Sequence, residues 1–175
     1  LGAQYALNAD KLPEGMLCIN AAFNPFGSLA APLFSKTAKW FARSHWLPRV
    51  LASPSLRWRG TGSMLADTGS AVDPLMGRCY DTLLGNPDHI AGTLRMMAGW
   101  DLPPLLRCLP SLQMPVWLAA AEGDRTIPPE RSTSVANDLP LARAVRIPGL
   151  GHLAHEENPE IFEELFQEMR TKTAA

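Results

Sequence analysis

An aspartate and a histidine in the second half of the chain have residue types and surroundings that suit proton transfer. Asp124 follows the apolar run 115–121, and His152 follows the run 142–147, each of which predicts a strand. Reactive groups of an open α/β sheet lie at the carboxyl ends of its strands, so we expect the two side chains at the same sheet edge. A carboxylate beside an imidazole fixes the tautomer of the ring and stabilises the imidazolium, which pairs a general base with its orienting acid.

Two neighbouring residues compete for these roles. His155 lies just beyond His152, but we expect it at the start of the following helical run. Glu122 lies just before Asp124, and the Gly-Asp pattern at 123–124 favours the aspartate. The structural alternative is a turn aspartate and a histidine held in a loop. Because each residue stands at the end of a predicted strand, we interpret Asp124 and His152 as catalytic.

The start of the chain matches the end of a nucleophile turn. In hydrolases built on such sheets the nucleophile stands on a sharp strand-to-helix turn, Gly-x-Ser-x-Gly, and precedes the acid and the histidine in the chain. Leu1-Gly2 and the small-residue helix predicted over 2–11 match the last two positions of that turn and the helix after it. We therefore expect the nucleophile, a serine, just before Leu1, the backbone N–H of Leu1 in the oxyanion hole, and Gly2 in close helix–strand contact. The 175 residues by themselves are then expected to be inactive.

Strands and helices alternate along the chain, which predicts an α/β fold with a mostly parallel sheet. Asn86-Pro87 and Asn158-Pro159 each read as an N-cap followed by proline at the first helical position. A long helical stretch separates the first strand from the second and predicts an inserted cap. The expected strands are 16–22, 115–121 and 142–147, and the expected helices are 2–11, 33–42, 86–98, one opened by Asp101, 129–138 and 158–170. We divide the chain into core (1–28), helical cap (29–110) and core (111–175).

Composition excludes several classes of protein. With 46% hydrophobic and 19% charged residues the chain is not intrinsically disordered. No apolar run is long enough for a transmembrane helix. Three widely spaced cysteines without a Cys-x-x-Cys argue against a zinc site or a disulfide framework and for a reducing, cytoplasmic location. We expect no metal, no organic cofactor and no nucleic-acid partner.

One segment of the predicted cap is basic and rich in tryptophan. No acidic residue lies between Glu14 and Asp67. That stretch contains the cations and indole rings Lys36, Lys39, Arg43, Arg49, Arg57, Arg59, Trp40, Trp46 and Trp58. Three interpretations stay open: a face for peripheral membrane contact, a site for a flat anionic ligand, or a solvated helix face with the rings in the core.

Several segments resemble a known family. The loop 123–128 resembles the acid loop of the α/β-hydrolase superfamily, and Gly151-His152 with Glu157-x-Pro159 resembles its histidine loop. Segments 20–27, 68–70, 89–102 and 149–157 are similar to the magnesium-chelatase accessory proteins of bacteriochlorophyll biosynthesis, the BchO type. The likeness covers about residues 1–165, and the Met-Met-Ala-x-Trp-Asp-Leu segment at 96–102 is its most specific part.

The resemblance implies the C-terminal portion of an α/β-hydrolase fold with a helical cap, in a protein tied to magnesium insertion into protoporphyrin, with magnesium-chelatase subunits as partners. The reaction it implies is acyl transfer to water on an ester or related bond of a small-molecule substrate, in which His152 acts as base and acid. Caps of this architecture close over active sites, which makes Met97 and Trp100 candidates for substrate contact. Asn20 and Phe23 follow a strand end and are further candidates.

Two alternatives to ester hydrolysis stay open. The first is a non-catalytic accessory protein that binds a tetrapyrrole, in which the basic segment meets the propionates and the tryptophan rings stack on the macrocycle. The second keeps the fold but has an aspartate nucleophile, which gives epoxide or haloalkane hydrolysis. The residue before Leu1 discriminates among the three interpretations.

Overall fold

Three parallel strands form the sheet, in the order β1 (Met16–Ile19), β2 (Val116–Ala121) and β3 (Ala142–Ile147). The computed structural model describes residues 1–23, 44–57, 61–99 and 102–173. All six residues of β2 are buried, as expected for a central strand with two covered faces. The second and third predicted strands are confirmed.

The first predicted strand is shorter and less buried than its apolar sequence indicates. It ends at Ile19 instead of residue 22, because Asn20 adopts a left-handed backbone with φ 45° that interrupts the extended conformation. All four of its residues are half-buried, whereas burial on both faces was predicted. In the described part of the chain β1 pairs with β2 along one edge.

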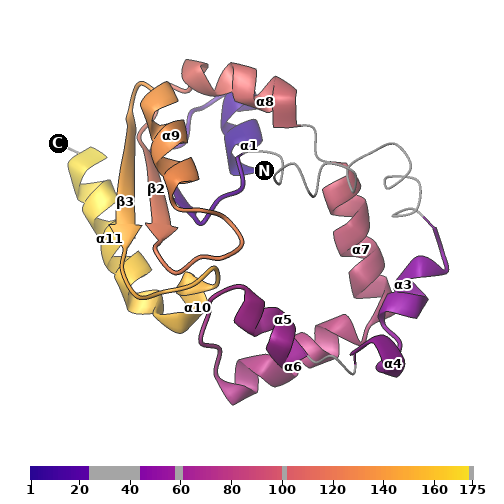
Figure 1. Cartoon of the computed structure of the whole chain (residues 1–175). Helices are drawn as coiled ribbons and strands as arrows, with labels where there is room; N and C mark the ends of the chain where they lie inside the picture. Colours follow the sequence, from indigo (N-terminus) through magenta and orange to yellow (C-terminus); the bar gives the residue numbers. More distant parts are fainter. Residues whose placement is uncertain (24–43, 58–60, 100–101, 174–175) are drawn as a thin grey trace. The chain divides into compact units, whose positions relative to one another are not determined.

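Side chains alternate between the two faces of β2 and divide the core in two. Val116 and Leu118 pack with α1 (Gly2–Asn8), η2 (Leu109–Ser111) and α9 (Glu130–Asp138), with α8 (Leu102–Cys108) beside them. Trp117 and Ala119 face α10 (Ala154–Glu157) and α11 (Pro159–Thr173). Figure 1 shows α9 and α11 on opposite sides of β2 and β3. The sheet unit is thus a three-layer α/β arrangement.

The last helix follows the amphipathic pattern of its sequence. In α11 the side chains of Phe162, Leu165 and Met169 are buried against the sheet, at the spacing of one helix face. The helix predicted over 158–170 is confirmed and continues to Thr173. No helix in the described ranges is long and apolar enough to cross a lipid bilayer.

Every regular element described between β1 and β2 is a helix. Besides α8 and η2, these are α3 (Leu47–Leu51), α4 (Pro54–Arg57), α5 (Thr61–Asp67), α6 (Pro74–Leu84) and α7 (Pro87–Ala98). The predicted cap at Asn86 is confirmed, since its Oδ1 accepts from the backbone N–H groups of Asp88 (2.9 Å) and His89 (3.3 Å). The helix predicted over 33–42 and the capping role of Asp101 lie outside the described residues.

The chain divides into two units, each described by itself. The sheet unit comprises 1–23, 67–71 and 102–175, and the helical unit comprises 24–66 and 72–101. Five residues in the middle of the predicted cap therefore belong to the sheet unit, as do α8 and η2. That the helical unit acts as a cap over a site stays a prediction.

Part of the basic, tryptophan-rich stretch is visible on α3 and just before it. Trp46 is 53% exposed, and the exposed Arg49 donates to the backbone oxygen of His45 at 2.7 Å. Lys36, Lys39 and Arg43 lie outside the described residues. At Trp46, then, the indole ring is at the surface and not in the core.

The three cysteines differ in exposure, which predicts different reactivity. Burial raises the pKa of the Cys18 thiol from 9.0 to about 11. At a pKa of about 11, about one Cys18 thiol in a thousand is ionised near pH 8. Because the thiolate is the reactive form, Cys18 should react slowly. We expect a chromogenic disulfide reagent to label the exposed Cys79 and Cys108 rapidly, and Cys18 only after unfolding. Peptide mass spectrometry checks the order, and equal labelling rates in the folded protein would contradict it.

Candidate active site

The side chains of Asp124 and His152 are in direct contact. The imidazole Nδ1 lies 2.8 Å from Oδ2 of the carboxylate. The Asp124 side chain is fully buried, whereas that of His152 is 28% exposed. The other carboxylate oxygen, Oδ1, accepts from the backbone N–H groups of Thr126 (2.7 Å) and Ile127 (2.8 Å). The buried carboxylate is thus held by two backbone donors on one oxygen and by the imidazole on the other.

The parallel pairing of β2 with β3 produces this contact. Ala121 and Ile147 are register partners at the carboxyl ends of the two strands, and the two loops that follow are joined by backbone hydrogen bonds. Glu122 N–H donates to the Ile147 oxygen (2.9 Å), and Gly123 N–H donates to the Leu150 oxygen (2.8 Å). The predicted proximity of Asp124 and His152 is therefore present in the structure.

The contact leaves the second ring nitrogen of His152 available for chemistry. With Nδ1 facing the carboxylate, the favoured neutral tautomer carries its proton on Nδ1 and leaves Nε2 as a proton acceptor. A positive charge formed on the ring would lie next to a buried carboxylate that has no water to screen it. This arrangement can accept a proton at Nε2, stabilise the imidazolium and return the proton.

Asn20 connects the end of β1 to both of these loops. Its side-chain Oδ1 accepts from Ala121 N–H (2.8 Å), and its Nδ2 donates to the backbone oxygens of Gly151 (3.0 Å) and His152 (2.8 Å). The residue is 6% exposed, and its left-handed backbone is a conformation that asparagine tolerates well. We predicted that Asn20 borders the site and contacts substrate. The structure instead uses both of its amide protons to hold the backbone that carries His152.

The predicted turn residues begin the first helix. Leu1 precedes α1, is 93% exposed and accepts from Tyr5 N–H through its backbone oxygen (2.9 Å). A Cβ added at Gly2 would lie 3.1 Å from Sδ of Met16 in β1, so the helix does pack closely on the strand. The oxyanion-hole role of Leu1 stays a prediction.

The three apolar substrate candidates are found in different surroundings. Phe23 is 8% exposed and belongs to the core cluster around Leu118, so it packs within the sheet unit. Met97 is half-buried on α7 of the helical unit. Trp100 lies outside the described residues. Substrate contact by these side chains stays a prediction.

The two competing residues, His155 and Glu122, take no part in the contact between Asp124 and His152. His155 is exposed on α10, and its Nε2 lies 3.7 Å from Oε1 of Glu156. Glu122 is also exposed. Among the residues that the structure describes, no three histidine, cysteine, aspartate or glutamate side chains gather as metal ligands would.

One glutamate of the site makes long-range contacts that the sequence did not predict. Glu157 lies two residues before α11 begins. It ends the short helix α10, and its Oε1 accepts from Gly151 N–H (2.8 Å) while its Oε2 accepts from Ala71 N–H (2.9 Å). The Glu157-x-Pro159 motif marked the position, but no local pattern indicates a bond to residue 71.

The donor role of Asn20 can be tested by substitution. Asn20→Asp keeps the acceptor for Ala121 N–H and the tolerance for left-handed backbone, but places a carboxylate against two carbonyl oxygens. We expect it to lower the free energy of unfolding of the full-length protein by about 2 kcal/mol in denaturant titrations. The matched control is Asn8→Asp, whose exposed amide donates to Gln4 O within α1 (2.7 Å), with an expected loss below about 1 kcal/mol. Equal losses would contradict the role given to Asn20.

A curated relative is similar to most of this chain. The magnesium-chelatase 30 kDa subunit of Rhodobacter capsulatus is 38% identical over 138 residues, which are 79% of this chain and 48% of that protein. The chain thus spans about half the length of this relative.

Solved structures match the fold at low sequence identity, and the family model gives the assignment. A thermophilic esterase from Thermogutta terrifontis superposes with TM-score 0.68 at 19% identity, over 99% of this chain and 61% of that one. MenH from S. aureus superposes with TM-score 0.64 at 16% identity, over 99% and 65%. The model of the alpha/beta hydrolase family matches residues 1–165, and the chain therefore belongs to the α/β-hydrolase family.

Proposed function

We propose that Asp124 and His152 are the acid and base of a Ser-His-Asp hydrolase that transfers an acyl group to water. The observation that supports this most strongly is the 2.8 Å contact between a fully buried carboxylate and a partly exposed imidazole. A histidine held only for structural reasons has no need of a partly exposed ring, whereas the His152 side chain is 28% exposed. The family assignment agrees with this chemistry, although the family also includes members with other reactions.

The proposed reaction has two steps. In the first, Nε2 of His152 takes the proton of the nucleophile hydroxyl as its oxygen attacks the ester carbon, and then returns that proton to the leaving alcohol. In the second, Nε2 takes a proton from water as the water oxygen attacks the acyl group, and returns it to the released nucleophile. Asp124 stabilises the imidazolium in both steps. The nucleophile is proposed to precede Leu1, whose N–H then contributes to the oxyanion hole.

The setting of this activity is proposed from the relative. Because a magnesium-chelatase subunit is 38% identical to this chain, we propose that the protein acts in bacteriochlorophyll biosynthesis together with magnesium-chelatase subunits. The second candidate function has the same support: a tetrapyrrole-binding accessory role that does not require hydrolysis. The hydrolase proposal requires the imidazole of His152 as a base, whereas the tetrapyrrole-binding role does not. Each candidate function has its own test.

The hydrolase proposal is tested by replacing the histidine in the full-length protein. We expect His152→Ala to lower kcat for a chromogenic ester on the order of a thousandfold, since the general base is lost. Asp124→Asn should lower kcat by a similar factor, because the amide favours the wrong ring tautomer.

The control is His155→Ala, which removes an exposed imidazole three residues further along the chain, on α10, and should leave kcat unchanged. Hydrolysis that survives in His152→Ala, or that is absent from the wild-type protein with a panel of acyl chain lengths, would overturn the proposal.

The accessory role predicts saturable binding of protoporphyrin. We expect tryptophan fluorescence of the full-length protein to be quenched on titration, and the quenching to weaken when Lys36, Lys39 and Arg43 are changed to glutamine. The matched control changes the exposed Arg78, Arg95 and Arg107, which should leave binding unaltered. Quenching that does not saturate, or that responds equally to both sets, would remove the support for this role.

A further inference from the structure

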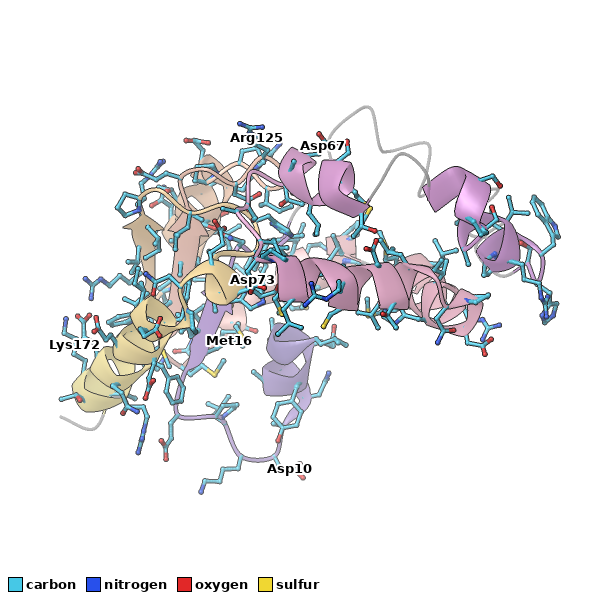
Figure 2. The ribbon with its side chains drawn as sticks, turned by 90° about the horizontal axis from the view of Figure 1, so that it is seen from below. Asp10, Met16, Asp67, Asp73, Arg125 and Lys172 are labelled. Carbon is cyan, nitrogen blue, oxygen red and sulfur yellow. The ribbon has the colours of Figure 1, made fainter. Side chains whose placement is uncertain are left out.

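A five-residue segment inserted in the middle of the helical unit contacts both loops of the candidate active site. Residues 67–71 belong to the sheet unit, although the chain on either side belongs to the helical unit. The backbone oxygen of Thr68 accepts from Arg125 N–H (3.2 Å) and from His152 N–H (3.2 Å). Figure 2 labels Asp67 and Arg125, which lie close together where this segment meets the acid loop. We call residues 68–71 the strap.

Further hydrogen bonds fix the strap to the histidine loop. Ser70 Oγ accepts from Leu153 N–H at 2.8 Å, directly after His152 in the chain. The carboxylate of Glu157 connects the histidine loop to the strap. Gly151 N–H donates to its Oε1 (2.8 Å), and Ala71 N–H donates to its Oε2 (2.9 Å). The backbone after His152 is thus bonded to the strap directly, at Ser70. The backbone before His152 is connected to Ala71 of the strap through Glu157.

Gly69 of the strap fits against the two loops without space for a side chain. Gly69 has φ +81°, and a Cβ there would lie 2.1 Å from the backbone oxygen of Gly123, in the acid loop. A Cβ at Gly151 would lie 2.4 Å from the carbonyl carbon of Gly69. Such contacts are backbone against backbone, so a side chain at Gly69 or Gly151 would force the segments apart.

We propose that the strap positions the imidazole of His152 against the carboxylate of Asp124, with Ser70 and Glu157 as its positioning residues. The inference rests on the proposed function, since it assigns these residues a role in the same proton-transfer site. Thr68 links the two loops directly, while Ser70 and Glu157 hold the backbone on either side of His152. Their bonds act through the loop and not on substrate.

The magnitude of the effect follows from the geometry that proton transfer needs. A displacement of about 1 Å in a catalytic group lowers the rate by up to a hundredfold, while substrate affinity depends on other contacts. Loss of one strap bond should therefore lower kcat about tenfold and leave KM unchanged. A purely structural role would instead lower the unfolding temperature without a specific loss in kcat.

The experiment compares four variants of the full-length protein. Ser70→Ala removes the acceptor for Leu153 N–H, and Glu157→Gln places an amide donor against one of two backbone donors. Ser70→Thr keeps the hydroxyl and should restore kcat. Ser111→Ala removes a hydroxyl whose bond, to Cys108 O at 2.7 Å, stays within one turn, and should match the wild type.

Two readouts are recorded for each variant: ester-hydrolysis kinetics, and the low-field proton NMR signal of the His152 Nδ1–H group. We expect Ser70→Ala and Glu157→Gln to lower kcat about tenfold at constant KM and to lose this signal by faster exchange with water. Unchanged kcat with an intact signal in both variants overturns the positioning role proposed for the strap. If the wild type hydrolyses no ester, the proposed function fails and the proton signal alone decides: its loss in both variants supports the strap, and its retention overturns it. If Glu157→Gln does not fold, Ser70→Ala decides.

Discussion

The buried carboxylate of Asp124 is the constraint on which the site depends. A carboxylate without access to water must be surrounded by donors, and the backbone N–H groups of Thr126 and Ile127 supply them for one oxygen only. The other oxygen has the imidazole of His152 as its partner. Removing the ring would leave a buried charged oxygen without that donor. The structure therefore has to hold the loop after β3 (148–153) at a fixed distance from the loop after β2 (122–129).

Three backbone-directed side chains share that task, and each comes from a different part of the chain. Asn20, Ser70 and Glu157 all bind main-chain groups close to His152. They use neutral or charge-assisted hydrogen bonds to the backbone, so the loop is held without any group competing for the reactive ring nitrogen.

The sequence predicted the elements whose signal is local. The apolar run 115–121 predicted β2, the segment 142–147 predicted β3, and Asn86-Pro87 predicted the start of α7, because burial and capping depend on neighbouring residues. The predicted end of β1 was wrong because the left-handed backbone of Asn20 is fixed by partners at the end of β2 and in the loop after β3. The roles of Thr68 and Glu157 were not predicted for the same reason. Their partners are backbone groups far away in the sequence, and a main-chain N–H leaves no trace in residue types.

The tautomer of His152 tests the central claim most directly. Nitrogen-15 NMR of histidine-labelled full-length protein, at a pH where the ring is neutral, reports which ring nitrogen carries the proton. The contact of Nδ1 with Oδ2 of Asp124 predicts a protonated Nδ1 and an unprotonated Nε2, ready to accept a proton. A neutral ring protonated on Nε2, or one that exchanges equally between the two forms, would contradict a base held and oriented by Asp124.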